Sequence, residues 1–152
     1  MERTLIIAKP DAVQRGLVGQ IIGRLEQKGL KLIGLKMARL DETMLRTHYA
    51  EHIEKSFYEG LENFMKSSPV VLMAFEGLEC TEAVRLLVGA TNPRQAVPGS
   101  IRGDFAMDTG RNVVHASDSN ESGQAEVSNF FDPHELFDYD KSEYIHVYED
   151  QK

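Results

Sequence analysis

The sequence predicts an α+β protein whose strands form a ferredoxin-like βαββαβ sandwich. Short apolar runs alternate along the chain with segments in which apolar residues recur at helical spacing. The resulting order is strand, helix, strand, helices, strand, helix, loop, strand, helix. A chain of 152 residues is long enough for one domain with one substantial core. We therefore expect a single domain over residues 1–152, with a four-stranded antiparallel sheet covered by helices, a long loop and a C-terminal tail.

The first third of the chain predicts two strands joined by a helix. The apolar run Leu5–Ala8 ends just before Pro10 and is typical of a buried strand. Apolar residues keep helical spacing over Leu17–Lys28, and Gly29 offers a left-handed C-terminal cap. The segment Leu32–Leu40 predicts the second strand.

The middle of the chain predicts two helices and the third strand. Asp41 can cap a helix that runs to about His52. The segment Phe57–Met65 again has helical spacing, and Pro69 follows its end. The continuous apolar run Val70–Phe75 indicates a strand that is buried on both faces.

The last third begins with a predicted helix over Glu79–Val88, which ends at a glycine. The segment Thr91–Arg111 is rich in Gly and Pro and has no sustained period, so we expect a long functional loop. A short strand over Val113–His115 and a helix over Glu121–Phe131, with Ser119 as its cap, complete the order. Four aromatic residues in the tail that begins at residue 132 indicate that the tail packs against the domain.

Composition excludes several classes of protein. The net charge of −7 argues against a general nucleic-acid-binding face, although a local cluster of Arg and Lys can still bind phosphate. A single cysteine allows neither an internal disulfide nor an all-cysteine zinc site. The N-terminus lacks the pattern of a signal peptide, and no apolar run approaches the roughly 20 residues that cross a bilayer. We expect a cytoplasmic protein with no membrane association and no obligatory nucleic acid.

The familiar kinase motifs do not occur. The sequence contains neither a G-x-x-x-x-G-K-[ST] loop nor a G-x-G-x-x-G loop. His48-Tyr49-Ala50-Glu51-His52 does match H-x-x-E-H, which is the zinc signature of one class of metalloprotease. Two histidines four residues apart share a helical face, but a third protein ligand is not identified. A zinc hydrolase is therefore one alternative, and a polar helix face near a pocket is the simpler interpretation.

His115 is the candidate nucleophile, because it ends a predicted strand within Asn112–Asp118. A neutral imidazole attacks phosphorus with one bare ring nitrogen, while the other nitrogen keeps its proton, preferably held by a carboxylate. Glu126 lies on the following helix and can fold back to supply that carboxylate.

Phosphoryl transfer also needs cations that stabilise the charge on the phosphoryl oxygens. Lys9 ends the first strand, and Arg85 lies on a predicted helix. Arg102 and Arg111 flank the end of the glycine-rich loop. The side chain of Phe57 can either stack on a base or pack in the core.

The whole chain, from Thr4 to about Glu149, resembles the nucleoside diphosphate kinase family. The motifs that carry the resemblance are Lys9-Pro10-Asp11-Ala12-Val13 with Arg15-Gly16, Tyr49, Gly89-Ala90-Thr91-Asn92-Pro93, Pro98-Gly99-Ser100-Ile101-Arg102-Gly103-Asp104-Phe105 and Gly110-Arg111-Asn112-Val113-Val114-His115-Ala116-Ser117-Asp118. Several long motifs in the same order make this far more specific than any single element.

The resemblance implies a ping-pong exchange of the γ-phosphate between nucleoside triphosphates and diphosphates through a phosphohistidine on Nδ1 of His115. Glu126, with help from Ser117, would hold the other ring nitrogen, and Tyr49 would lie against His115. The remaining roles that the resemblance implies are phosphate binding by Arg85, Thr91 and Arg102, contacts of Lys9 and Asn112 with ribose and phosphates, and a base slot formed by Phe57 and Leu61. Thr109 stands where the family commonly has an apolar residue that contacts the base.

The resemblance further implies a Mg²⁺ cofactor that binds mainly through the nucleotide phosphates and has no direct protein ligand. Stacking tolerates every base, so broad base specificity follows. A homo-oligomer is expected, a hexamer rather than a tetramer, because the tail is as long as in hexameric members. Ala116 stands where the family commonly has Gly, which a negative φ would tolerate. An inactive family member that only binds nucleotides remains the other alternative.

Overall fold

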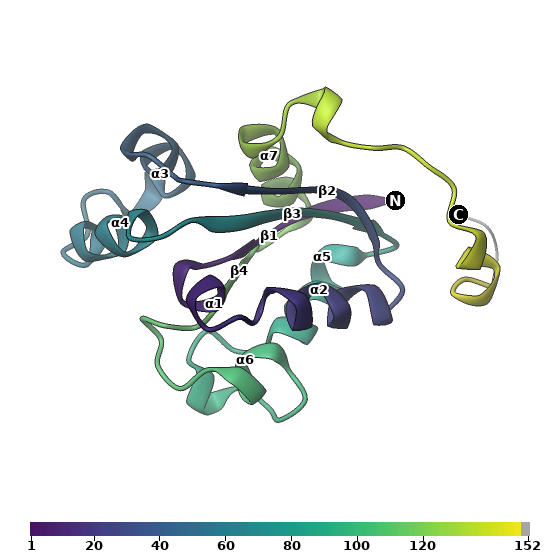
Figure 1. Ribbon diagram of the computed structural model, residues 1–152, viewed down its shortest axis with the longest axis horizontal. Helices are drawn as coiled ribbons and strands as arrows, with labels where there is room; N and C mark the ends of the chain where they lie inside the picture. Colours follow the sequence, from purple (N-terminus) through teal and green to yellow (C-terminus); the bar gives the residue numbers. More distant parts are fainter. Residues whose placement is uncertain (150–152) are drawn as a thin grey trace.

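The computed structural model describes residues 1–149, so the last three residues of the predicted 1–152 domain lie outside the described residues. Its four strands are β1 (Glu2–Ala8), β2 (Lys31–Ala38), β3 (Val70–Gly77) and β4 (Val114–Ala116). They form one sheet in the order β2-β3-β1-β4, and every neighbouring pair is antiparallel (Figure 1). The predicted ferredoxin-like α+β fold is confirmed.

Helices cover both faces of the sheet (Figure 1). One face carries α1 (Pro10–Gln14), α2 (Val18–Gln27), α5 (Cys80–Val88) and α6 (Ile101–Phe105), which pack around Ile6, Met73 and Phe75. The other face carries α3 (Glu42–His48), α4 (Tyr58–Lys66) and α7 (Asn120–Phe130), which pack around Leu5, Ile7 and Leu72. The central strands β1 and β3 are therefore buried on both faces, as their continuous apolar runs predict.

The predicted ends of several helices are confirmed by their caps. The side chain of Asp41 accepts a hydrogen bond from the backbone N–H of Met44 at the start of α3, and Ser119 accepts one from Ser122 at the start of α7. Gly89 follows α5 with a φ of 89°, a conformation that glycine adopts without strain. None of the helices in residues 1–149 has both the length and the apolar character that crossing a membrane requires.

The predicted helix from Asp41 to His52 is interrupted. Helix α3 ends at His48, and Tyr49 leaves the helical region with φ −104° and ψ 30° before a separate 3-10 turn, Ala50–His52. His48 and His52 therefore do not share one continuous helix, which removes the geometric basis of the H-x-x-E-H zinc interpretation.

The segment Thr91–Arg111, which we expect to be a loop, contains two short helical pieces. A 3-10 turn covers Pro93–Gln95, and Ser100 caps helix α6 by accepting a hydrogen bond from the N–H of Gly103. Helix α1 is also absent from the prediction. Elements of three to five residues are too short to show a hydrophobic period, which explains both differences.

The C-terminal tail crosses back over the sheet edge, which confirms that it packs (Figure 1). The N–H of Phe137 donates to the carbonyl of Ile33 at 2.9 Å, and the Lys31 ammonium donates to the carbonyl of Tyr139 at 2.8 Å. The hydroxyl of Tyr148 accepts a hydrogen bond from the N–H of Leu78 at 3.1 Å. The tail is thereby attached to β2 and to the end of β3.

Candidate active site

A cavity of about 1100 Å³ opens beside β4, between α3 and α4 on one side and α5 and the 91–111 segment on the other. Eleven of the twelve predicted site residues line it: Lys9, Tyr49, Phe57, Leu61, Arg85, Thr91, Arg102, Thr109, Asn112, His115 and Glu126. Ser117 is buried just behind the wall. Residues from the first strand to the last helix thus converge on one cavity.

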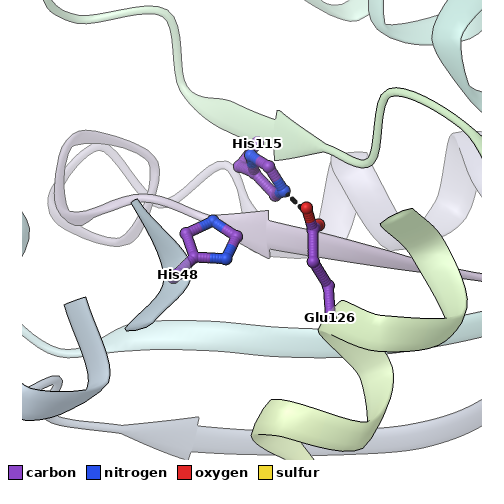
Figure 2. A group of neighbouring side chains, drawn as sticks. All are labelled: His48, His115 and Glu126. Atoms are coloured by element: carbon purple, nitrogen blue, oxygen red, sulfur yellow. Dashed lines mark hydrogen bonds and ion pairs between the residues drawn. The ribbon is translucent and has the colours of Figure 1, made fainter. Parts of the chain in front are cut away.

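His115 is held by two elements that are adjacent in the fold. It sits in β4 opposite Ile7 of β1, and its Nε2 atom lies 2.7 Å from Oε1 of Glu126 on α7 (Figure 2). The hydroxyl of Ser117 donates to the same carboxylate oxygen at 2.7 Å. Within residues 1–149 the Nδ1 atom of His115 makes no hydrogen bond, so its lone pair can face a substrate.

The Glu126 carboxylate is kept ionised by its partners. Burial acts to raise its pKa, but the hydrogen bonds from His115 and from Ser117 lower the pKa below its usual value. An ionised carboxylate accepts hydrogen bonds only, so Nε2 of the imidazole must be the donor. This arrangement fixes the tautomer in which Nδ1 carries the lone pair.

A second histidine, His48, packs edge-on against His115, with ring centroids 4.5 Å apart and an interplanar angle of 80° (Figure 2). Both of its ring nitrogens are buried and have no hydrogen-bond partner in the described part of the chain. Burial, and then the neighbouring His115, lower its pKa to about 3, so the ring is neutral. The sequence predicts either a zinc ligand or a polar helix face near a pocket at His48, and its contact with His115 is not predicted because it joins residues far apart in the chain.

Tyr49 lines the same cavity and packs edge-on against His48, with ring centroids 4.6 Å apart. Burial raises the pKa of its hydroxyl, followed in effect by the charge of Glu126, so the phenol stays protonated. The ring packed on His115 itself is that of His48, and Tyr49 presents its side chain to the cavity one residue further along.

Lys9, Asn112 and Thr91 form a hydrogen-bonded chain across the cavity. The Lys9 ammonium donates to Oδ1 of Asn112 at 2.8 Å, and the amide of Asn112 donates to the carbonyl of Thr91 at 3.0 Å. Burial, and then repulsion from Arg102, lower the pKa of Lys9 to about 8. A cation destabilised in this way gains from any anionic ligand that enters the cavity.

The two arginines differ in how they are held. Arg102 is buried and donates to three backbone carbonyls, those of Gly89, Asn112 and Val114, at 2.7–3.2 Å. Burial, and then Arg85, lower its pKa to about 10. Arg85 is exposed and pairs with Asp118 at 3.0 Å. Arg102 therefore ties the end of α5 and the 91–111 segment to β4, whereas Arg85 lies at the surface in an ion pair with Asp118.

The residue before β4 is in a strained conformation. Val113 has a φ of 62°, which a β-branched residue rarely adopts, and this is why β4 begins at Val114 and not at Val113 as predicted. Its N–H donates to Oδ2 of Asp11 at 3.0 Å, and its carbonyl accepts from the N–H of Lys9 at 2.9 Å. These bonds hold the turn that presents His115. Ala116 has no positive φ, so the methyl group that replaces the usual glycine fits.

The outer end of the cavity is apolar. Phe57 is 54% exposed at the start of α4, and Leu61 and Phe64 follow on the same helix. Thr109 faces them from the loop, and the guanidinium of Arg111 lies 3.9 Å from the centre of the Phe64 ring. A flat ring fits between such surfaces, because aromatic and apolar side chains accept any π-face.

The cavity combines a histidine held by a carboxylate, several cationic side chains and an apolar slot. This combination defines a phosphotransferase that acts on nucleotides. The family model described as "Nucleoside diphosphate kinase" matches residues 2–136. The nucleoside diphosphate kinase of Archaeoglobus fulgidus is 52% identical over 151 residues, which are 99% of this chain and 100% of that protein. That of Chloroflexus aggregans is 60% identical over 137 residues, 90% of this chain and 91% of that protein.

The fold of this chain is also similar to that of solved structures. A halophilic nucleoside diphosphate kinase from Halobacterium salinarum in complex with CDP has a TM-score of 0.94 and 48% identity, and the match covers 97% of this chain and 98% of that one. A nucleoside diphosphate kinase family protein from Babesia bovis has a TM-score of 0.95 and 42% identity, and the match covers 97% and 100% of the two chains. The chain belongs to the nucleoside diphosphate kinase family. It is a nucleoside-diphosphate kinase, which exchanges a phosphoryl group between nucleotides by the family's ping-pong phosphohistidine mechanism.

Proposed function

We propose that His115 is the histidine that carries the phosphoryl group. Its Nδ1 attacks the γ-phosphorus of a nucleoside triphosphate, the bond from that phosphorus to the β-γ bridging oxygen breaks, and the diphosphate leaves with those electrons. An acceptor diphosphate then attacks the phosphohistidine and regenerates the free ring. The observation that carries this proposal is the 2.7 Å contact from Nε2 of His115 to Glu126, which reserves Nδ1 for the attack.

Glu126 and Ser117 act on His115 throughout the cycle. The ring gains positive character as Nδ1 bonds to phosphorus, and the Glu126 carboxylate stabilises that charge at Nε2. Ser117 donates to Glu126 at 2.7 Å and fixes the orientation of the carboxylate. Tyr49 completes the wall of the cavity beside the transferring group.

We assign phosphate binding to Arg85, Thr91 and Arg102. Arg85 exchanges Asp118 for phosphate oxygens, and Arg102 contributes its charge and the N–H groups that its carbonyl contacts leave free. Lys9 and Asn112, already joined at 2.8 Å, bind the ribose and the phosphates.

The base lies in the apolar slot and stacks on Phe57, with Leu61 and Thr109 along its edge. The exposed face of Phe57 supports this placement. Recognition then rests on ribose and phosphates, so purine and pyrimidine nucleotides are accepted alike.

A divalent metal requirement is compatible with a nucleotide kinase, and we propose that the metal is Mg²⁺ held mainly through the nucleotide phosphates. Mg²⁺ prefers oxygen ligands and keeps several waters. Within residues 1–149, the group of potential metal ligands in the cavity contains two histidines and one carboxylate, which is not a magnesium site. When bound, the metal would neutralise phosphate charge, and the cations of the chain would position the same oxygens.

We further propose one catalytic domain over residues 1–152, a cytoplasmic location and a homo-oligomer, with a hexamer favoured over a tetramer. Strand β2 lies at the edge of the sheet, and its outward side chains Leu35 and Met37 are 50% and 63% exposed. Such an apolar edge favours contact with another subunit. Light scattering of the purified protein should give the molar mass of six subunits. The molar mass of four subunits would exclude the hexamer.

The assignment of His115 is tested by incubating the purified protein with γ-labelled ATP and magnesium. The label should be lost in acid, survive base, transfer to added GDP and be absent from His115→Ala. No label on folded wild-type protein would leave only a nucleotide-binding module. Label on His115→Ala would show that another residue is the nucleophile.

A further inference from the structure

Three side chains from different elements present metal-binding atoms to one point inside the cavity. His48 from α3, His115 from β4 and Glu126 from α7 each offer one ligand atom, and these atoms all lie within 4.8 Å of one another (Figure 2). Two imidazoles and one carboxylate are the protein ligands of several catalytic zinc sites, which keep the fourth position open.

The ring nitrogens of His48 are available as ligands because no other group in residues 1–149 hydrogen-bonds to them. Both of its ring nitrogens are buried and lack a hydrogen-bond partner in residues 1–149, although buried polar atoms are normally paired. Carboxylate and imidazole side chains both bind zinc, and the Glu126 carboxylate already contacts Nε2 of His115 at 2.7 Å.

We propose that this group is a transition-metal site at which Zn²⁺ binds His48, Nε2 of His115 and the carboxylate of Glu126, and thereby blocks phosphorylation of the histidine. Tetrahedral zinc with bonds of about 2.0–2.2 Å places its ligand atoms roughly 3.4 Å apart. The contact between His115 and Glu126 would open from 2.7 Å, and His48 would move inward. The fourth position faces the cavity and is open to water or a phosphate oxygen.

Zinc on Nε2 removes the nucleophile through the tautomer of the ring. In the metal-free site the Nε2 proton is donated to Glu126, and Nδ1 holds the lone pair. When Nε2 binds zinc, the single proton of the neutral ring must reside on Nδ1, which then cannot attack phosphorus. Mg²⁺ does not compete, because it prefers oxygen ligands and retains water.

The binding itself is tested on nucleotide-free, untagged protein by calorimetric titration with Zn²⁺ in excess Mg²⁺. We expect one Zn²⁺ per subunit in the wild type. Binding should be at least tenfold weaker in His48→Phe, which keeps an aromatic ring at this position but has no nitrogen to bind the metal. The matched control is His52→Phe, which removes the second histidine of the H-x-x-E-H segment and should leave binding unchanged. No saturable binding, equal affinity in His48→Phe, or equal loss in His52→Phe would overturn the site.

The inhibition rests on the proposed role of His115, so it is measured separately as labelling by γ-labelled ATP. Zn²⁺ should suppress labelling of the wild type, and a zinc-selective chelator should restore it. The Zn²⁺ concentration that halves labelling should be at least tenfold higher for His48→Phe than for the wild type. Undiminished labelling of zinc-loaded wild type would overturn the inhibition, whereas absence of labelling without zinc would instead contradict the role of His115.

Discussion

Nε2 of His115 and Oε1 of Glu126 lie 2.7 Å apart although the residues belong to different elements, a strand and the helix that follows it. The hydroxyl of Ser117 donates a hydrogen bond to the same oxygen. The carboxylate thus determines which ring nitrogen keeps its proton and which is free for phosphorus.

Glu126→Gln should slow the phosphorylation of His115 by about 10²-fold, because the amide keeps the shape but not the charge that stabilises the ring. Rapid-quench labelling with γ-labelled ATP measures this rate. Glu121→Gln, on the exposed side of the same helix, is the matched control and should match the wild type. Equal rates in the two variants would contradict the role of the Glu126 charge.

Lys9 should leave a signature in the pH dependence of stability. Its pKa in the folded protein is about 8, and in the unfolded chain it is about 10.4. The unfolded state therefore binds more protons between these values, so this lysine makes unfolding less favourable as the pH rises from 8 to 10.4. In denaturant titrations across that pH window, the free energy of unfolding of the wild type should rise relative to that of Lys9→Met. A constant difference would show that the pKa of Lys9 is not lowered.

Asp11→Ala should destabilise the fold by about 1–3 kcal/mol, because the buried N–H of Val113 loses its acceptor. The strained turn before β4 should then relax, and the rate of labelling should fall with the stability. Asp11→Asn retains an acceptor oxygen and should recover most of both. Equal damage from Ala and Asn, in urea titration and labelling, would show that the charge of Asp11 matters and not the hydrogen bond.

Arg102→Lys should cost about 1–3 kcal/mol of stability, because one ammonium cannot reach the carbonyls of Gly89, Asn112 and Val114 together. Arg85→Lys is the comparison, since Arg85 is exposed and within residues 1–149 its side chain hydrogen-bonds only to that of Asp118. Its effect on stability should stay within about 0.5 kcal/mol, while nucleotide affinity falls. Thermal unfolding in which Arg85→Lys is the less stable variant would contradict the different roles of the two arginines.

The strands were predictable because apolar runs such as Val70–Phe75 must be buried on both faces, and Asp41 and Ser119 mark helix starts by their chemistry. Helices α1 and α6 were not, since five residues do not complete a hydrophobic period.

The sequence and the resemblance to the family predict the contact of Glu126 with His115, whereas they do not predict the contact of His48 with His115. The placement of His48 on His115 joins residues that only the fold brings together. The left-handed turn at Val113 opposes the residue's own preference and depends on the hydrogen bond that its N–H donates to Oδ2 of Asp11. Neither relationship leaves a local pattern in the sequence.

The position of the phosphoryl group on the imidazole ring tests the central claim most directly. Phosphorus-to-nitrogen and phosphorus-to-proton couplings in the NMR spectrum of the phosphorylated, ¹⁵N-histidine-labelled protein distinguish Nδ1 from Nε2. Phosphate on Nδ1 of His115, with Nε2 still protonated and bonded to Glu126, is the result we predict. Phosphate on Nε2, or on any other residue, would contradict the account.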